Sequence, residues 1–274
     1  MPPWDAPFVE AVVNYIDPTA PIGGINDVER ERSTFTLVPH RVRIHDARAL
    51  TPQPGLDRTG FAWLRRPTAV ADFLDPAEVE AVYLPEAEAL VREVTGADKV
   101  LVFGHVLRDG ALATSPHRPV YNAHVDYNEE TVRAVARRLL PPGEQPERLA
   151  QRILLVNVWR PLEPVESAPL ALCDASSVDR GDLVFGPIGG KSAAGVPDAA
   201  GWNLAYSPAH RWSYLPSMSP DEVLVFKLCD TDRSQPQWTA HTAFDDPASA
   251  PGARPRRSIE LRTLAFLPDE RSRS

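Results

Sequence analysis

The second half of this chain is a succession of short segments rich in β-branched and aromatic residues, and this pattern limits the folds that the chain can adopt. The strongest strand signal is in residues 153–159, Ile-Leu-Leu-Val-Asn-Val-Trp. Further strands separated by turns are expected at 170–173, 182–185, 202–206, 211–214, 222–229 and 256–266. Many short strands, with helices mainly before them, predict a mainly β protein with helical decoration, a double-stranded β-helix of the jelly-roll or cupin type.

Two helices are expected before these strands. The first begins after Asp75, which is suited to cap a helix N-terminus, and stops at Gly96. The second begins after Asn128 and ends before Pro-Pro-Gly at residues 141–143. The basic end of the second helix, with Arg137 and Arg138, complements the helix dipole and does not suggest phosphate binding.

The length of the chain allows one large domain or two ordinary ones. We expect a single domain over residues 1–274. A helix-containing N-terminal part, about residues 1–115, is expected to pack on a jelly-roll core of about residues 116–267.

Charge and cysteine content exclude several classes of protein. A net charge of −8 with a pI near 5.4 disfavours a general nucleic-acid role. Cys173 and Cys229 do not make a disulfide framework, and each lies in an apolar run, which predicts buried free thiols in a reducing, cytoplasmic compartment. No signal peptide is visible, and no apolar stretch is long enough to span a membrane.

Residues 120–127, Val-Tyr-Asn-Ala-His-Val-Asp-Tyr, have the composition of a strand. Side chains two apart on a strand share one face, so His124 and Asp126 are predicted to project side by side. With a second histidine they would form the 2-His-1-carboxylate triad of non-haem Fe(II) oxygenases, which leaves coordination positions open. The spacing alone is not specific, because a surface histidine beside an aspartate in a loop gives the same pattern.

The order of the strands suggests the missing parts of such a site. His241 precedes the last strand, and His210 is the competing third ligand. Arg256 and Arg262 share one face of the last strand, and either guanidinium could bind the distal carboxylate of 2-oxoglutarate. The structural alternative for both arginines is a salt bridge with Glu260. We predict His241 as the ligand and favour Arg256 for the cosubstrate.

Several further side chains are candidates for the pocket. Asn157 lies in a very apolar strand and needs a partner there, which is either a ligand or, as is more common, a neighbouring backbone group. We assign Asn157 to cofactor binding. Candidates for the substrate pocket are Tyr121, Trp159, His210 and Trp212.

The sequence resembles the hydroxylase/desaturase family that includes gibberellin desaturase-like proteins, fungal natural-product hydroxylases and a cephamycin 7-hydroxylation component. Seven stretches carry the resemblance and span nearly the whole chain in order. They are Asp46-Ala47-Arg48, Ala123-His124-Val125-Asp126, Val156-Asn157-Val158-Trp159-Arg160-Pro161, Pro169-Leu170-Ala171-Leu172-Cys173-Asp174, Ser207-Pro208-Ala209-His210-Arg211-Trp212, His241-Thr242-Ala243-Phe244 and Pro255-Arg256-Arg257-Ser258-Ile259-Glu260-Leu261-Arg262.

The resemblance implies a non-haem Fe(II) dioxygenase that uses 2-oxoglutarate and O2 to hydroxylate or desaturate a small natural product. It implies His124 and Asp126 as iron ligands. It also leaves open a biosynthetic partner protein, because the cephamycin component works with one. The substrate, the oxidative outcome and the oligomeric state are not specified by the sequence.

Two other classes of function compete with this interpretation. One is a cupin-like isomerase or hydrolase that uses Zn or Mn and consumes no 2-oxoglutarate. The other is a non-catalytic accessory protein that keeps a degenerate site. The paired arginines of the last strand favour a carboxylate cosubstrate, and the intact His124-x-Asp126 pair argues against degeneration.

Overall fold

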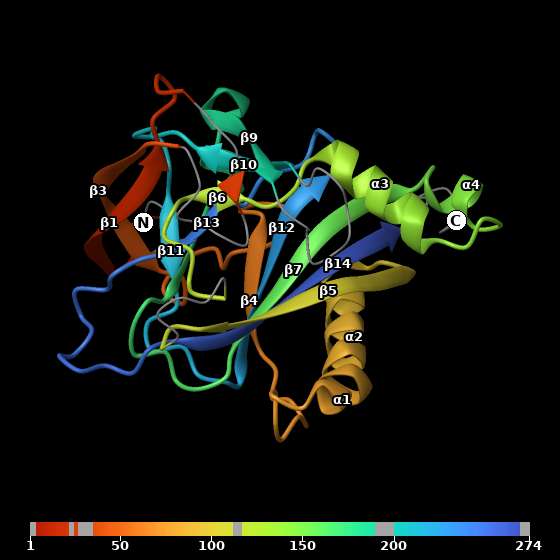
Figure 1. The fold of residues 1–274 in the computed structure, drawn as a ribbon, viewed down its shortest axis with the longest axis horizontal. Helices are drawn as coiled ribbons and strands as arrows, with labels where there is room; N and C mark the ends of the chain where they lie inside the picture. Colours follow the sequence, from red (N-terminus) through yellow and green to blue (C-terminus); the bar gives the residue numbers. More distant parts are fainter. Residues whose placement is uncertain (1–3, 22–24, 27–34, 112–116, 190–199, 269–274) are drawn as a thin grey trace.

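The structure is a computed structural model of the chain. It describes residues 4–21, 25–26, 35–111, 117–189 and 200–268. Two β-sheets dominate these residues, and the helices lie at the outside of the sheets (Figure 1). Among the described residues, no helix is long and apolar enough to cross a membrane.

The larger sheet has nine strands and holds both the N-terminal strands and several short strands of the second half. Its strands, in spatial order, are β1 (Phe8–Ile16), β3 (Leu37–Asp46), β11 (Trp212–Tyr214), β8 (Leu170–Cys173), β13 (His241–Ala243), β6 (His124–Val125), β10 (Ala200–Leu204), β9 (Leu183–Gly189) and β2 (Ile25–Asn26). Single bridges from Asn14 to Asn122 and from Ile16 to Ala205 join β1 to the other side of the sheet. The sheet is therefore nearly closed on itself.

The smaller sheet has five strands and contains the longest apolar segments of the chain. Its order is β4 (Phe61–Arg65), β12 (Glu222–Asp230), β7 (Arg152–Pro161), β14 (Arg257–Leu267) and β5 (Lys99–Asp109). All neighbours in this sheet are antiparallel. Asn157 on β7 stands opposite Arg262 on β14 and Phe226 on β12.

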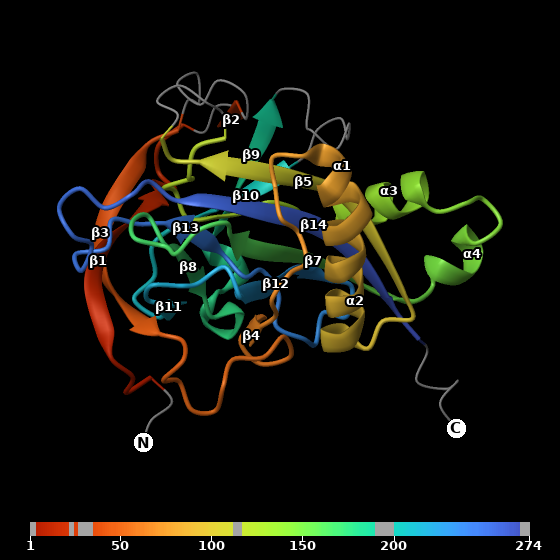
Figure 2. The same cartoon turned by 90° about the horizontal axis from the view of Figure 1, so that it is seen from below.

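Helices cover the outer face and one end of the five-stranded sheet (Figure 2). The helices are α1 (Pro76–Glu78), a π-helical turn at Val79–Tyr83, α2 (Leu84–Thr95), α3 (Glu129–Leu139) and α4 (Gln145–Arg148). Two single 3-10 turns, Ala175–Ser177 and Arg180–Asp182, lie in the connection from β8 to β9 of the other sheet. Asp75 caps α1, Gly96 ends α2 with φ of 70°, and Asn128 caps α3, as the sequence predicts.

Two hydrophobic clusters explain why the central strands are apolar on both faces. One lies between the two sheets and includes Leu155 and Trp159 of β7. The other lies between the five-stranded sheet and α2, and includes Val156 and Val158 of the same strand. Alternate side chains of β7 therefore enter two different hydrophobic cores. A polar side chain on this strand, such as Asn157, is buried and needs a polar partner.

The predicted strand over residues 120–127 is wrong in its length. Only His124–Val125 forms a strand, and Asp126 lies just beyond it. The Ala123 amide donates to the Asn14 carbonyl and the Ala123 carbonyl accepts from Leu204, so neighbouring segments hold this stretch without a long ladder. The division of the chain into an N-terminal part and a jelly-roll core near residue 115 stays a prediction. The strands β1, β3, β4 and β5 come before this point and are hydrogen-bonded into the two sheets.

Candidate metal centre

Two histidines meet in the middle of the nine-stranded sheet. His124 on β6 and His241 on β13 are direct partners in the antiparallel register, and their ring centroids are 4.3 Å apart. His241 is buried and His124 is half-buried. Strand pairing therefore places next to each other two imidazoles that are far apart in the sequence.

Asp126 lies between the two rings. Its Oδ1 is 3.4 Å from Nε2 of His124, and its Oδ2 is 3.6 Å from Nε2 of His241. One ligand atom from each of the three residues lies within 4.8 Å of the other two. The pair predicted from the His-x-Asp spacing is thus brought together with His241.

Backbone carbonyls orient both imidazoles. Nδ1 of His124 is 2.8 Å from the carbonyl oxygen of Asn122, and Nδ1 of His241 is 3.3 Å from the carbonyl oxygen of Thr239. Because a carbonyl only accepts, each Nδ1 donates its proton in these contacts, and Nε2 is the ring atom that faces Asp126. Such a contact fixes the tautomer of a metal-binding histidine.

Burial and neighbouring charges shift the pKa values of His241 and Asp126. Burial, together with the neighbouring His124, lowers the pKa of His241 to about 3, and Asp126 opposes this only in part. Burial alone would raise the pKa of Asp126, but the hydrogen bond from His124 and the charges of His241, His124 and Arg262 hold this pKa well below its usual value. Asp126 is therefore a carboxylate at neutral pH.

The donor set fits a first-row divalent metal. Two imidazole nitrogens and one carboxylate on a single face match the 2-His-1-carboxylate pattern, which leaves positions free for other ligands. Asn157 from the facing sheet donates from Nδ2 to Oδ2 of Asp126 at 3.2 Å. The buried amide of Asn157 therefore has a partner, which is the candidate ligand Asp126. The Oδ1 atom of Asn157 has no hydrogen-bond partner among the described residues.

A small cavity connects the two histidines to the last strand. Its lining includes His124, His241, Trp159 and Arg256. Arg256 is buried, its Nη1 donates to the Ala168 carbonyl at 2.6 Å, and its Nε has no hydrogen-bond partner among the described residues. Its guanidinium carbon lies 5.3 Å from the centre of the Trp159 ring.

Arg256 is a buried cation with weak compensation. Burial and the charge of Arg108 lower its pKa to about 9, against opposing effects of Tyr121 and Glu260. Oγ of Ser258 and Oε1 of Glu260, on the same strand face, also lack hydrogen-bond partners among the described residues. Buried polar groups without a hydrogen bond are costly, so Arg256 and Ser258 have unused capacity to bind a polar ligand.

Arg262 occupies a different position from Arg256. Its Nε is 3.7 Å from Oε1 of Glu260, and its guanidinium lies 5.7 Å from the centre of the Tyr127 ring. Its charge contributes to the low pKa of Asp126. Of the two arginines, Arg262 is therefore the one that forms the ion pair with Glu260, which was the alternative to binding the cosubstrate.

Two other predicted pocket residues lie beside the site. Trp159 on β7 stands opposite Glu260 and lines the small cavity. Tyr121 is half-buried, and burial together with Asp245 raises the pKa of its hydroxyl, whereas Arg256 lowers it.

His210 and Trp212 are not brought to the three candidate ligands. Nε2 of His210 is 3.1 Å from Oδ2 of Asp182, and its ring stacks on Tyr15 with centroids 5.7 Å apart. Trp212 donates from Nε1 to the Tyr15 hydroxyl at 2.7 Å, inside the core between the sheets. Tyr15 joins these two residues into one aromatic cluster, and their role in a substrate pocket stays a prediction.

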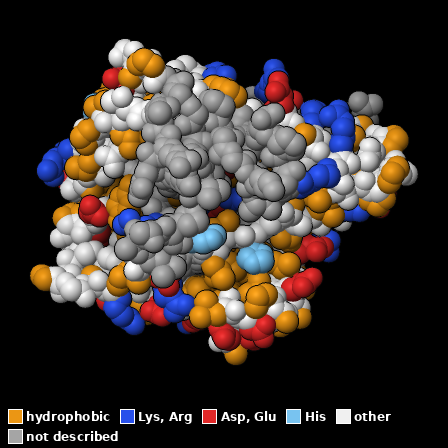
Figure 3. Space-filling model, in the orientation of Figure 1, with side chains coloured by type: hydrophobic (Ala, Val, Ile, Leu, Met, Phe, Trp, Pro, Cys, Tyr) orange, Lys and Arg blue, Asp and Glu red, His pale blue; other side chains and the backbone are white. Residues whose placement is uncertain are grey.

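A second, larger cavity of about 680 Å³ is lined in part by residues of α3 and by its cap, Asn128. Its aromatic wall is formed by Phe185, Trp202 and Trp238, and Trp202 is the register partner of Val125, next to His124. Arg180 lies 4.2 Å above the Trp202 ring. Lys and Arg side chains gather beside α3 in the space-filling view of this face (Figure 3).

Several of these residues have no recognisable signal in the sequence. Thr239 and Asn122 act through backbone carbonyls, and Trp202 and Trp238 come from turns and short strands without a motif. Arg108 lies in a β-rich segment, where its charge alone could have suggested a polar pocket.

Comparisons with known proteins agree with this geometry. A family model described as an oxidoreductase/YMDC permease-like domain matches residues 13–266. The hydroxylase/desaturase efuI of Hormonema carpetanum is 30% identical, over 97% of this chain and 97% of its own length. The Fe(II)/2-oxoglutarate-dependent dioxygenase nvfI of Aspergillus novofumigatus is 31% identical, over 86% of each chain.

Solved structures give the same answer for the fold. A variant of the iron and alpha-ketoglutarate-dependent endoperoxidase NvfI superposes with a TM-score of 0.85 at 27% identity, covering 96% of this chain and 98% of that chain. The predicted jelly roll and the predicted enzyme class, with Fe(II), 2-oxoglutarate and O2, are confirmed. The chain belongs to the family of Fe(II)/2-oxoglutarate-dependent hydroxylases and desaturases.

Proposed function

We propose that His124, Asp126 and His241 hold Fe(II) and that the chain hydroxylates or desaturates a small natural-product intermediate. The observation that carries this proposal is the convergence of two Nε2 atoms and one carboxylate within 4.8 Å of one another. Iron in such a site, together with 2-oxoglutarate and O2, supplies the oxidising power for attack on an unactivated C–H bond. The residues of this chain supply ligands, orientation and exclusion of water.

Arg256 is proposed to bind the distal carboxylate of 2-oxoglutarate. It lines the same small cavity as both histidines, and its Nε has no hydrogen-bond partner among the described residues. A guanidinium can bind a carboxylate through two parallel hydrogen bonds. A bound carboxylate would also compensate the buried charge that lowers the pKa of Arg256.

The substrate is proposed to occupy the larger cavity. Trp202 connects this cavity to the metal centre, since it pairs with Val125 directly after His124. Phe185 packs edge-on against Trp202, with ring centroids 5.5 Å apart. Flat aromatic walls suit an apolar ring system, and the charged residues of α3 at the rim, Glu129 and Arg133, suit polar substituents.

The remaining expectations are proposals about the whole protein. We propose that residues 1–274 act as one domain and that the chain works in a reducing, cytoplasmic compartment, which the buried free thiols of Cys173 and Cys229 support. We also propose that the chain works with a biosynthetic partner protein. Full activity of the isolated chain would contradict this proposal.

Fe(II)-dependent formation of succinate from 2-oxoglutarate tests the proposed function. The isolated chain is expected to form succinate slowly without substrate, and Asp126→Ala is expected to abolish this. Asp182→Asn is the matched control, because Asp182 also contacts a histidine, His210, but away from the three ligands. If the wild type converts a substrate in a metal-dependent way but forms no succinate, the proposal is contradicted. A cupin-like isomerase or hydrolase would then be favoured.

A further inference from the structure

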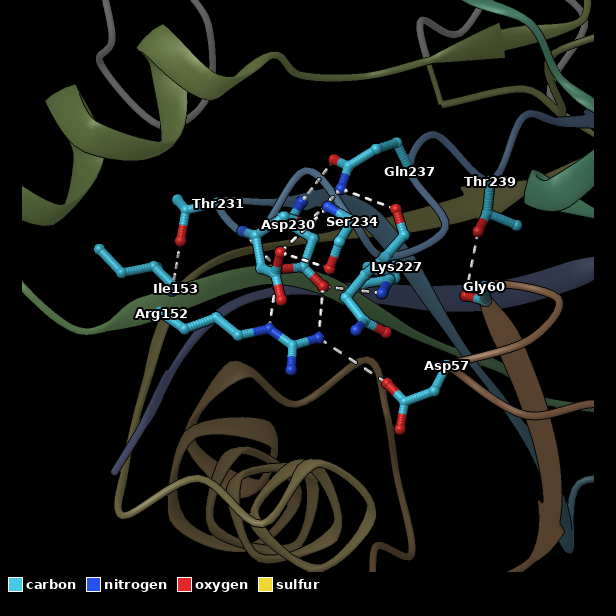
Figure 4. A network of polar contacts seen from close by, with 12 residues as sticks. Asp57, Gly60, Arg152, Ile153, Lys227, Asp230, Thr231, Ser234, Gln237 and Thr239 are labelled. Carbon is cyan, nitrogen blue, oxygen red and sulfur yellow. Dashed lines mark hydrogen bonds and ion pairs between the residues drawn. The ribbon is translucent and has the colours of Figure 1, made fainter. Parts of the chain in front are cut away.

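A cluster of buried charges lies at the end of β12, outside the candidate metal centre (Figure 4). Lys227 is fully buried, and its Nζ donates to Oδ2 of Asp230 at 2.8 Å. Arg152 donates to both carboxylate oxygens of Asp230, from Nε at 3.0 Å and from Nη2 at 2.7 Å. Buried charges are tolerated only when they are paired, and Asp230 pairs with both Lys227 and Arg152.

Asp230 also holds the connection from β12 to β13. Its amide donates to Oε1 of Gln237 at 3.1 Å, and its Oδ1 accepts from the Asp232 amide at 2.9 Å. Nε2 of Gln237 donates back to the Asp232 carbonyl at 2.9 Å. The charge cluster thus fixes the path of residues 231–240, which lead directly to His241.

Lys227 reaches the same connection through its backbone. The Thr239 amide donates to the Lys227 carbonyl at 3.0 Å, and the Lys227 amide donates to the Gly60 carbonyl at 2.7 Å. The Thr239 hydroxyl donates to the same Gly60 carbonyl at 3.0 Å. These three hydrogen bonds hold Thr239 from two sides. Figure 4 draws the one between Thr239 and Gly60.

Gly60 is required for this close approach. Its φ is 80°, a conformation that side chains disfavour. A Cβ there would collide with the Thr239 hydroxyl and lie 2.7 Å from Cβ of Ala175. The carbonyl of Gly60 can therefore serve both Thr239 and Lys227 only because no side chain separates them.

Thr239 in turn contacts His241. Thr239 is fully buried, and its carbonyl oxygen lies 3.3 Å from Nδ1 of His241. Nε2 of the same ring faces Oδ2 of Asp126 at 3.6 Å. The direction of the Thr239 carbonyl therefore decides which ring nitrogen carries the proton and which is available to a metal.

We propose that Thr239 is a positioning residue that fixes the ring orientation and tautomer of His241, and that the Lys227–Asp230 ion pair keeps Thr239 in place. This inference rests on the proposed function, in which His241 is a metal ligand. Lys227 itself does not reach the metal centre. By strand alternation its side chain shares the outer face of β12 with Val223 and Val225.

The first test uses Co(II) as a probe for the metal centre of the whole chain. Thr239→Val removes the hydroxyl but keeps the shape, and it should raise the dissociation constant for Co(II) about tenfold. Thr239→Ser keeps the hydroxyl and should bind Co(II) like the wild type. Thr263→Val is the matched control, because Thr263 is also fully buried and donates to a backbone carbonyl, that of Val156, in the other sheet from His241.

The tautomer of His241 gives a readout that does not need metal. Long-range nitrogen–proton correlations of the imidazoles distinguish the protonated from the unprotonated ring nitrogen. In the metal-free wild type and in Thr263→Val, the His241 proton should lie on Nδ1. In Thr239→Val, part of the population should carry it on Nε2.

The ion pair is tested by Lys227→Met, which should also weaken Co(II) binding. Glu222→Gln is its control, since Glu222 lies on the same strand and pairs with Arg48 at 2.8 Å. Equal Co(II) affinities in the Lys227 and Glu222 variants, or an unchanged His241 tautomer in Thr239→Val, would overturn the inference. Failure of the proposed function gives a different result, in which His241→Ala binds Co(II) as tightly as the wild type.

Discussion

His124 and His241 are register partners on the antiparallel strands β6 and β13, with their ring centroids 4.3 Å apart. Each ring uses Nδ1 toward a backbone carbonyl and Nε2 toward Asp126. The metal centre is therefore held by main-chain pairing, with both imidazoles already oriented before any metal binds. Such preorganisation lowers the cost of binding, because little rotamer freedom is lost.

Arg256→Met is expected to raise the dissociation constant for 2-oxoglutarate between about tenfold and a hundredfold, since hydrogen bonds to charged groups contribute about 1.5–3 kcal/mol. Calorimetric titration of the Co(II)-loaded protein measures this change. Arg257→Met is the control, because Arg257 is the next residue but pairs with Asp109 and Glu163. Similar losses in both variants would show that Arg256 has no special role.

Lys227→Met is expected to lower the free energy of unfolding by about 3 kcal/mol, because it leaves Asp230 as a buried charge with one partner fewer. Urea denaturation measures the change. Arg66→Met breaks a surface pair with Glu93 and should cost less than about 1 kcal/mol. A loss of equal size in the two variants would mean that the buried pair adds no more than a surface pair.

Stability should fall at alkaline pH through Cys173. Burial raises the pKa of its thiol to about 12, from 9.0, and the hydrogen bond with Ser177 offsets this only in part. Above pH 9 the unfolded chain releases this proton while the folded chain keeps it, so rising pH favours unfolding.

The expected loss from Cys173 between pH 8.5 and pH 10 is about 1 kcal/mol. Urea denaturation of the wild type and of Cys173→Ala at both values isolates this contribution, because other titrating groups are common to both proteins. A pH dependence that is identical in the two proteins would show that the thiol ionises as easily in the folded state.

Local signals in the sequence predicted much of the fold. Asp75, Gly96 and Asn128 mark helix ends through backbone groups that only a few residue types satisfy. The apolar run at residues 153–159 lies within β7, whose two faces enter two different cores. These features depend on neighbours in the chain and are therefore visible without the structure.

The site was predictable only where residue type and order sufficed. His124 and Asp126 stand two residues apart, but the strand around them is short, and it is pairing with β13 that brings His241 to them. Arg256 and Arg262 share one strand face, so alternation could not separate them. Their contacts distinguish them, because Arg256 contacts Trp159 and the Ala168 carbonyl. Arg262 contacts Tyr127 and Glu260 instead.

The contact between Thr239 and His241 could not be predicted from the sequence. It acts through its carbonyl oxygen, which every residue has, and its own position depends on Gly60 and Lys227 from distant segments. No local pattern records such a contact, because it exists only once β4, β12 and the connection to β13 have come together.

The most direct test of the metal centre is an anaerobic titration of the metal-free protein with Fe(II) and then 2-oxoglutarate, followed by visible absorption. A weak charge-transfer band should appear only when both are present, and it should be lost in His241→Ala but kept in His210→Ala. Retention of the band in His241→Ala, or no band in a wild type that binds Fe(II) stoichiometrically, would contradict the assignment of His124, Asp126 and His241 as the site where iron and 2-oxoglutarate meet.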